Sequence, residues 1–208
     1  MERAEAVRKL RGLIGKDIRQ LADQYGITVW KGDRKNKGWF GHTIEALLGL
    51  PPNTSKKPNF GSWELKCIPV KRLKSGKVVF KETMAISNFS ATYLLEHPFE
   101  NSSVYGKLRS AVICVRMFES QKELSSKLVA VAAFDLEDKD LYRQLKADYD
   151  LAREALRTRG YKSLTGKMGV LIQPRTKGKG HGSISRAFYA RKQFLEIIIS
   201  DTLKQLNS

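Results

Sequence analysis

The sequence predicts an α/β (α+β) fold, in which a mixed central sheet is flanked by helices. Apolar residues recur at helical spacing over residues 3–25 and 140–159. Over residues 61–70 apolar and polar side chains alternate instead, which is the period of a half-buried strand. Two later runs, 112–118 and 128–134, are apolar nearly throughout and are therefore expected to be central strands.

Glycines delimit the expected helices, which span residues 3–25, 38–48, 140–159 and 192–206. Gly15 is expected to break the first of them and Gly26 to stop it. Gly160 follows the long helix, where a glycine commonly forms the C-terminal cap.

Turn residues separate the expected strands, which span residues 61–70, 78–86, 112–118, 128–134, 168–172 and 187–189. The turn at 74–77 joins the first two into a hairpin. Three segments are expected to be loops: a basic one at 30–37, a turn-rich one at 51–58 and a glycine-rich basic one at 175–186.

The chain carries a large excess of positive charge, with 38 Lys and Arg against 21 Asp and Glu and a formal net charge of +17. Nucleic acid is the usual partner of such a protein, because each neutralised phosphate releases counterions. A membrane-surface protein is the alternative, but it would concentrate its charge on one amphipathic helix or tail. Here the basic residues are spread from Arg3 to Lys204, which favours nucleic acid.

The sequence does not predict membrane insertion or export. No run approaches the ~20 apolar residues of a membrane span, and the charged start at residues 1–5 lacks an apolar signal core. Cys67 and Cys114 each lie in an apolar run and are expected to be buried, reduced thiols. We therefore expect a cytoplasmic protein.

The sharpest chemical feature is Glu64-Leu65-Lys66, which follows Pro58-Asn59. On a strand, Glu64 and Lys66 project from the same face, beside a third group from the preceding loop. Phosphodiester hydrolysis uses such a set, because carboxylates hold Mg²⁺ while a lysine orients the attacking water or offsets developing charge. The carbonyl of Leu65 could add a hard oxygen ligand. A solvated ion pair on an exposed strand is the alternative.

Glu45 strengthens the catalytic interpretation. It follows Ile44 on the expected helix 38–48, whose apolar side must pack against the core. A carboxylate at this position is either a rim residue or part of a site.

Several segments, in order along the chain, resemble the MutH mismatch-repair endonuclease family, which also contains GATC-cutting type II restriction enzymes. The entry helix is matched by Lys37-Gly38-Trp39-Phe40-Gly41 with Glu45 and Leu48-Gly49, and the catalytic hairpin by residues 57–60 and 63–69. The run 71–77 is closer to the restriction branch. Ser102-Ser103-Val104 with Lys107-Leu108 resembles the supporting-lysine segment, residues 174–178 the base-reading loop, and residues 187–192 the start of the last helix.

The resemblance implies a role for each matched residue. Glu64 and the position of Asn59 would bind metal, and Lys66 would be the catalytic lysine. Glu45 would be an accessory acid and Lys107 a second lysine near the scissile phosphate. The resemblance also implies DNA contacts: Lys37 to the backbone, and Lys177 and Tyr189 to the bases.

The residues themselves suggest further DNA contacts. Lys71 and Arg72 would bind phosphates without reading sequence. Arg175, Lys177, Lys179 and Arg186 lie in the glycine-rich loop, where lysine or arginine would read guanine in the major groove. A solvated loop is the alternative there. Ser102 and Ser103 would be donors to phosphate or simply helix caps.

Two departures from the family concern Asn59. The family has aspartate at this position, and its spacing to the glutamate is longer than that between Asn59 and Glu64. Asparagine keeps an oxygen ligand but loses a full negative charge, so Mg²⁺ affinity and water activation should fall. Either an aspartate was replaced to trap uncleaved DNA, or the chain is a naturally weakened nuclease.

The resemblance thus implies a single restriction-endonuclease-like domain, residues 1–208, with two lobes around a DNA cleft. The catalytic centre is expected within about 37–118 and the recognition elements within about 165–208. The expected activity is Mg²⁺-dependent, sequence-specific cleavage of double-stranded DNA by a bacterial or phage type II restriction enzyme of the GATC type.

Three alternatives stay open. The first is a methyl-directed nicking enzyme of mismatch repair, which would need a protein activator. The second is a DNA-binding module without catalysis. The third is an RNA-binding or ribosome-associated basic protein. The chain is expected to be a monomer or a weak homodimer on DNA.

Overall fold

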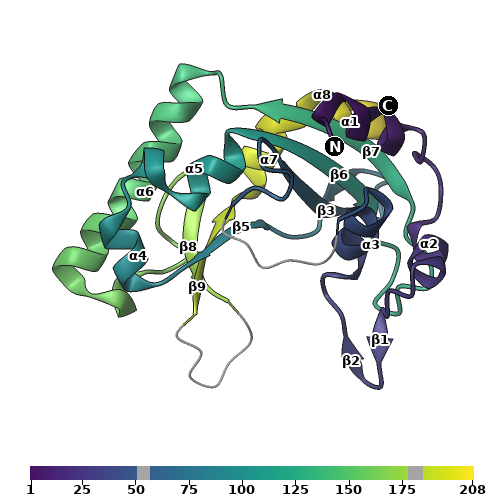
Figure 1. Cartoon of the computed structure of the whole chain (residues 1–208), viewed down its shortest axis with the longest axis horizontal. Coiled ribbons are helices and arrows are strands. Elements are labelled where there is room, and N and C mark those ends of the chain that lie inside the picture. Colours follow the sequence, from purple (N-terminus) through teal and green to yellow (C-terminus); the bar gives the residue numbers. More distant parts are fainter. Residues whose placement is uncertain (51–56, 178–184) are drawn as a thin grey trace.

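The computed structural model describes residues 1–50, 57–177 and 185–208. It contains a four-stranded mixed sheet, a three-stranded antiparallel sheet and a two-stranded ribbon, with helices packed around them (Figure 1). The predicted α/β (α+β) class, with a mixed central sheet flanked by helices, is confirmed.

The four-stranded sheet has the order β4-β3-β6-β7. Its strands are β3 (Glu64–Arg72), β4 (Val78–Phe80), β6 (Ser110–Met117) and β7 (Leu128–Asp135). β3 pairs with β6 in parallel, and the other two pairings are antiparallel. The prediction of two central strands is correct for β6 and wrong for β7, which lies at an edge. Its apolar side chains are accounted for by α1 and α8, which both pack on it.

Alternation along β6 divides the core between the two faces of this sheet. Val112 and Cys114 join a cluster with α1, α2 and α3, whereas Ile113 and Val115 join a larger cluster with the second sheet and the remaining helices. On β3, Leu65 faces the first cluster and Ile68 the second. The strand period of two therefore directs Glu64 and Lys66, which share the face of Ile68, toward the second sheet.

The three-stranded sheet has the order β5-β9-β8, formed by β5 (Met84–Phe89), β9 (Arg186–Ala190) and β8 (Ile172–Thr176). The expected strand 78–86 was wrong as one element, because residues 81–83 carry the chain from one sheet to the other. The expected strand 187–189 is confirmed as part of β9.

The strand expected at 168–172 begins only at its last residue. Asp148 on α6 accepts hydrogen bonds from the backbone N–H groups of Val170, Leu171 and Ile172, at 2.8, 2.6 and 2.9 Å. This carboxylate, 2 % exposed, takes the donors that a ladder would otherwise use.

The N-terminal segment forms two helices, α1 (Arg3–Arg11) and α2 (Ile18–Gln24). Gly15 and Gly26 have φ angles of 87° and 65°, which only glycine adopts easily, so the predicted break and stop are confirmed. The expected loop at 30–37 instead contains a two-stranded ribbon, β1 (Trp30–Lys31) and β2 (Arg34–Lys35). It leads into α3 (Trp39–Leu47), as predicted.

The remaining helical elements are α4 (Ala91–Glu96), the 3-10 turn η1 (Phe99–Asn101), α5 (Ser103–Leu108), α6 (Lys139–Arg159), the 3-10 turn η2 (Tyr161–Ser163), α7 (Lys192–Ile198) and α8 (Ser200–Asn207). α6 ends at Gly160 as predicted, with φ 74°. The single closing helix was expected to run unbroken, but it is interrupted at Ile199, whose φ of −129° is not helical.

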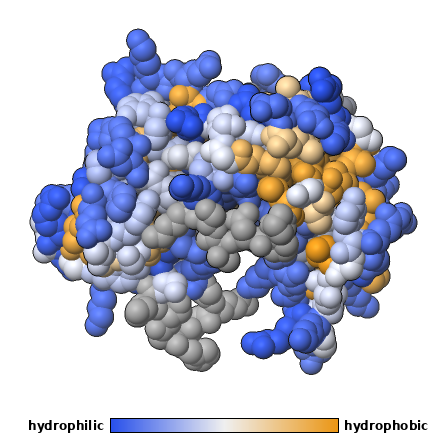
Figure 2. Space-filling model, viewed as in Figure 1, coloured by the Kyte–Doolittle hydropathy of each residue, from blue (hydrophilic) through white to orange (hydrophobic). Residues whose placement is uncertain are grey.

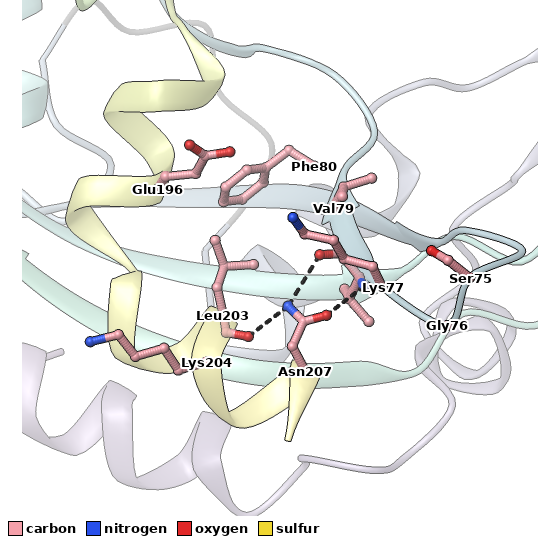
Figure 3. A pocket seen from close by; sticks show the side chains of 10 residues that line it. Ser75, Gly76, Lys77, Val79, Phe80, Glu196, Leu203, Lys204 and Asn207 are labelled. Carbon is pink, nitrogen blue, oxygen red and sulfur yellow. Dashed lines mark hydrogen bonds between the residues drawn. The ribbon is translucent and has the colours of Figure 1, made fainter.

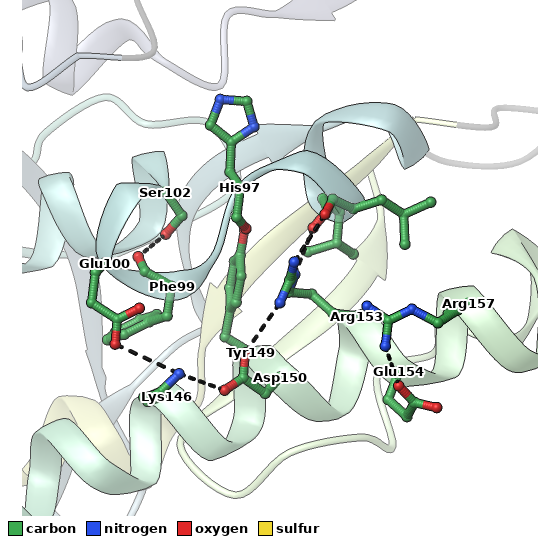
Figure 4. A network of polar contacts seen from close by, with 12 residues as sticks. His97, Phe99, Glu100, Ser102, Lys146, Tyr149, Asp150, Arg153, Glu154 and Arg157 are labelled. Atoms are coloured by element: carbon green, nitrogen blue, oxygen red, sulfur yellow. Dashed lines mark hydrogen bonds and ion pairs between the residues drawn. The ribbon is translucent and has the colours of Figure 1, made fainter.

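α6 is attached to the segment of α4 and η1 by polar contacts (Figure 4). The Tyr149 hydroxyl donates to the carbonyl of His97 at 3.0 Å, and Arg153 donates to the carbonyls of Leu94 and Leu95 at 3.0 and 2.9 Å. Helix carbonyls that lack an intrahelical partner are satisfied in this way, so α4 is held in place from outside.

α8 covers the free edge of β4 (Figure 3). The side-chain oxygen of Asn207 accepts from Val78 N at 2.7 Å, and its amide nitrogen donates to Val78 O at 3.3 Å. One side chain thus substitutes for a neighbouring strand and protects the edge from pairing with another chain. Beside this contact lies a hollow of about 720 Å³, lined by Lys77, Phe80 and Leu203 among others.

The surface agrees with the composition. Hydrophilic residues cover most of the face in Figure 2, with an apolar area toward the side that carries α1, α2 and α3. Within the three described ranges, no helix has the length and apolar character to cross a membrane. Both cysteines are free thiols, but only Cys114 is fully buried, and Cys67 is half-buried.

Candidate active site

Glu64 lies at the centre of a cluster formed by the residues predicted from the sequence. Its carboxylate is 1 % exposed. One oxygen, Oε1, lies 2.8 Å from Lys66 Nζ and 3.2 Å from Lys107 Nζ. The other, Oε2, accepts a hydrogen bond from Asn59 N at 2.9 Å. Two cations and a backbone donor therefore offset the burial of this charge.

Lys107 reaches Glu64 because α5 begins at a well-formed cap. Ser102 is the N-cap, and its side chain accepts from Tyr105 N at 3.2 Å. The helix then places Lys107, in its last turn, against the start of β3. Burial, followed by the positive charge of Lys66, lowers the pKa of Lys107 from its ordinary value.

A tight turn between Asn59 and Glu64 folds the chain back, so that the two residues contact each other despite the short spacing. Gly61 has φ 75°, and Phe60 stacks on Trp63 with ring centroids 3.9 Å apart. Phe60 N also donates to Trp63 O at 3.1 Å. The turn brings Asn59 N onto the Glu64 carboxylate, although only four residues separate them.

Asn59 also connects Glu64 to Glu45 on α3. Its amide nitrogen donates to Glu45 Oε1 at 2.9 Å. Burial, and then the negative charge of Glu64, raise the pKa of Glu45, against the opposing effect of His42 and the two lysines. An aspartate at position 59 could not donate this hydrogen bond and would place a third carboxylate between the two glutamates.

Lys66 has one partner that lies in the second sheet. Its Nζ donates to the carbonyl of Ile86 at 3.3 Å. Ile86 falls at the register shift of β5 against β9, where a bulge leaves a backbone group outside the ladder. A main-chain acceptor at a bulge has no signature in the sequence, so this contact was not predicted.

A cavity of about 170 Å³ opens beside the cluster. Lys37, Glu45, Leu65 and Lys66 line it, and all four were predicted site residues. Glu82 and Arg116 line it as well, and sequence reasoning missed both. Glu82 lies between two strands that were read as one, and Arg116 lies in a strand that was read as apolar core.

The donors near this cavity suit a hard divalent cation. Glu45 and Glu64 supply carboxylate oxygens, Asn59 an amide oxygen and Leu65 a carbonyl, and oxygen ligands of these kinds are preferred by Mg²⁺. Within the described residues no group of three or more His, Cys, Asp or Glu side chains is arranged to hold a metal. The oxygen donors are of the chemical kind that fits such an ion, but the set holds two acids, one fewer than an aspartate at position 59 would supply.

Comparison with known proteins relates the chain to DNA endonucleases. Residues 17–105 match the MvaI/BcnI restriction endonuclease family. The DNA mismatch repair protein MutH of Vibrio campbellii is 28% identical, over 94% of this chain and 92% of its own length. MutH of Vibrio cholerae is 26% identical over 94% of each chain, and MutH of a Shewanella species 26% identical over 94% of this chain and 93% of its own. The chain is thus similar to MutH proteins over most of its length and to a restriction endonuclease family over residues 17–105.

Other predicted DNA-binding residues lie on the second sheet. Arg175 donates to Thr83 Oγ1 at 3.1 Å, and its guanidinium lies 5.3 Å from the ring centre of Tyr189. Arg186 lies in the same way over Tyr161, at 5.0 Å. Arg175 is exposed on β8 and lies over Tyr189, so these two predicted residues are neighbours on the surface.

The remaining predictions are distributed more widely. Lys71 and Arg72 are exposed at the far end of β3, where Arg72 donates to Gly76 O at 2.7 Å. Lys177 N donates to Ser185 O at 2.9 Å, which extends the pairing beyond β8 and β9. Lys179 lies outside the described residues.

Ser103 is engaged within the protein. Its backbone N–H donates to the Tyr93 hydroxyl at 2.8 Å, and its hydroxyl lies 2.8 Å from that of Ser87. It is 8 % exposed. Of the two readings of Ser102 and Ser103, the helix cap is confirmed for Ser102, and the contact of Ser103 with DNA stays a prediction.

Proposed function

We propose that this endonuclease is a Mg²⁺-dependent type II restriction enzyme that cleaves double-stranded DNA at a GATC-type sequence. The observation that carries the proposal is the shared oxygen of Glu64, which lies within 3.2 Å of two lysine amino groups. Metal-assisted phosphodiester hydrolysis uses a carboxylate next to cationic side chains, beside a cavity lined by oxygen ligands.

In this proposal Glu45, Glu64, Asn59 and the carbonyl of Leu65 would hold the metal. When bound, Mg²⁺ would polarise the scissile phosphate and make the attacking water more acidic. A cation would also compete with the lysines for Glu64, so metal binding would free an amino group for the substrate.

The two lysines then have separate tasks. Lys66, fixed by Glu64 and Ile86, would orient the attacking water. Lys107, buried behind Glu64, would offset the charge that develops on the phosphate. Lys37, exposed at the cavity, would bind the DNA backbone. Cleavage would leave a 5′-phosphate and a 3′-hydroxyl.

Asn59 decides how active the chain is in this proposal. A neutral amide lowers the negative charge of the metal site, which weakens divalent-cation binding. Either this residue replaces an aspartate of a fully active enzyme, or the chain is a naturally weakened nuclease.

Reversion distinguishes the two. Asn59→Asp should raise plasmid cleavage in Mg²⁺ if the first reading holds, whereas Asn101→Asp, an exposed change of the same kind, should not. If Asn59→Asp does not raise plasmid cleavage, the first reading is contradicted and the naturally weakened nuclease is left. Metal-independent binding with no cleavage by either protein would support the alternative of a DNA-binding module, which the loss of charge at position 59 favours.

The product distinguishes restriction from nicking. MutH proteins are named for DNA mismatch repair, and a nicking enzyme of that kind would need an activating partner. Linear product from the purified chain would support the restriction reading, and nicked circles would support the alternative. In Ca²⁺, tighter electrophoretic binding to a duplex with GATC than to one without would support the target, and equal affinity would contradict it.

A further inference from the structure

The ribbon β1–β2 lies outside the catalytic cluster but close to it in the chain. Lys35 is followed after one residue by Lys37, which lines the cavity with Glu45 and Lys66. Asn36 fixes the connection, since its N–H donates to Val29 O at 2.9 Å and its side-chain oxygen accepts from Gly38 N at 3.1 Å. The ribbon is therefore a direct extension of the site.

The outer face of the ribbon is basic and open. Lys31 and Arg34 are exposed, and neither forms an ion pair within the part of the chain that the structure describes. Exposed Arg143, by contrast, forms an ion pair with Asp140. Trp30 is 40 % exposed and pairs with Lys35, so it lies on the opposite face of the ribbon from Lys31 and Arg34. Two exposed cations, against the single exposed acid Asp33 of the turn, suit a polyanion.

The ribbon is held firmly from behind. Glu123, 1 % exposed, lies 2.5 Å from Lys35 Nζ. Both its oxygens also accept from Arg116, at 2.8 and 3.0 Å. Glu123 adopts φ 51°, which is uncommon for a residue with a side chain, so the loop between β6 and β7 is shaped around this contact. Trp30 Nε1 donates to the carbonyl of Lys122 in the same loop, at 3.0 Å.

The contacts of Glu123 with Lys35 and Arg116 connect the ribbon to the cavity. Arg116 lines the cavity and lies 5.5 Å from the rings of Trp39 and Phe40 on α3. In Figure 1 the ribbon projects from the body on the same side as the free ends of β8 and β9. Of these two projecting elements, β8 and β9 carry predicted DNA-binding residues and the ribbon was not predicted to bind DNA.

We infer that the ribbon is a preorganised arm that binds the DNA backbone outside the recognised sequence. Lys31 and Arg34, which share one face of the ribbon, would neutralise phosphates. The contact carries no sequence information, so it adds affinity for any flanking duplex. Because Lys35 and Arg116 already share Glu123, the arm needs little ordering on binding. The inference rests on the proposed action on double-stranded DNA.

The test compares duplexes that carry the target with short or with long flanks, in Ca²⁺. Lys31→Ala with Arg34→Ala should weaken binding of the long duplex by about ten-fold and reduce the salt slope of log K by about 2, because each phosphate contact releases ~0.9 counterion. Arg8→Ala with Lys139→Ala, a matched pair on the exposed faces of α1 and α6, should change neither value.

Trp30 offers a second readout, since the other two tryptophans, Trp39 and Trp63, are 0% and 1% exposed. Acrylamide should quench mainly Trp30, and it should do so equally in the wild type and in the Lys31→Ala with Arg34→Ala variant, which shows that the ribbon keeps its fold. Equal affinity of the ribbon and control variants for the long duplex would overturn the inference while leaving the function intact. If the wild type binds no duplex, the proposed function itself fails.

Discussion

The amino group of Lys66 donates to the main-chain carbonyl of Ile86 at 3.3 Å, across the boundary between the two sheets. The same nitrogen lies 2.8 Å from Glu64. Ile86 belongs to β5, which pairs with the strand that carries Tyr189. The position of Lys66 therefore depends on how the second sheet, with its predicted base-reading residues, lies against the first.

Loss of Lys66 should separate cleavage from binding. Lys66→Met removes the amino group that would orient the water, so we expect cleavage to fall at least about a hundred-fold. Affinity for DNA should change little, because Lys66 is 17 % exposed and faces Glu64. Single-turnover cleavage, in the more active of the wild-type and Asn59→Asp backgrounds, and binding in Ca²⁺ measure the two effects. An equal loss in both would contradict the assigned role, and Lys139→Met provides the control.

Glu45 should make the metal-free protein less stable as pH rises. Burial, and then the charge of Glu64, raise its pKa above the ordinary 4.5. Between 4.5 and that raised pKa the folded state binds more protons than the unfolded chain, so the free energy of unfolding falls with increasing pH.

Glu45→Gln should weaken this fall, since glutamine keeps an oxygen acceptor for Asn59 and cannot ionise. Melting temperatures between about pH 4.5 and 7.5 in EDTA measure it. Glu96→Gln, an exposed change with the same chemistry, should follow the wild type. A constant difference in melting temperature between Glu45→Gln and the wild type at every pH would contradict the role of Glu45 in this pH dependence.

Lys107 should set an alkaline limit on cleavage. Burial and the neighbouring charge of Lys66 lower its pKa from 10.5, so it loses its charge at a lower pH than a free lysine. Lys107→Arg keeps a positive charge throughout this range. We expect the alkaline limb of the rate profile to move to higher pH in this variant, although the rate itself falls. Identical alkaline limbs in the two proteins would assign the limit to another group.

Asp148 should be important for stability and not for catalysis. Its carboxylate accepts from three consecutive backbone N–H groups and from Gln144 Nε2 at 2.9 Å. Asp148→Ala leaves those donors buried without an acceptor, which should lower the free energy of unfolding by about 3 kcal/mol. Urea denaturation tests this, with exposed Asp140→Ala as control. If Asp148→Ala lowers the free energy of unfolding by less than Asp140→Ala does, other contacts hold the start of β8.

Local patterns predicted the elements whose signals were strong. The apolar spacing of α6 and its glycine cap, and the alternation on β3, agree with the structure. The errors fall where tertiary contacts override the local pattern. Residues 78–86 are apolar enough for one strand, yet they supply two strands to different sheets. Residues 168–171 stay outside the ladder because Asp148, distant in the chain, binds their backbone.

The candidate site shows the same division. The strand period placed Glu64 and Lys66 together, the preceding loop and helix suggested Asn59 and Glu45, and the family resemblance added Lys107. The structure brings all five into one cluster. The contact of Lys66 with the Ile86 carbonyl and the contacts of Glu123 were not predictable. A backbone acceptor and a buried acid in a loop have no characteristic sequence pattern.

The fold class, the basic charge and the residue types of the candidate cluster could be predicted from the sequence, because they depend on composition and on spacing within single elements. Which partner each group has depends on contacts between distant segments. Asn59 joins two glutamates, Lys66 bridges two sheets, and Glu123 holds the ribbon beside the cavity. The physical reason is that a buried charge is stable only where distant segments supply its counter-charges and hydrogen bonds.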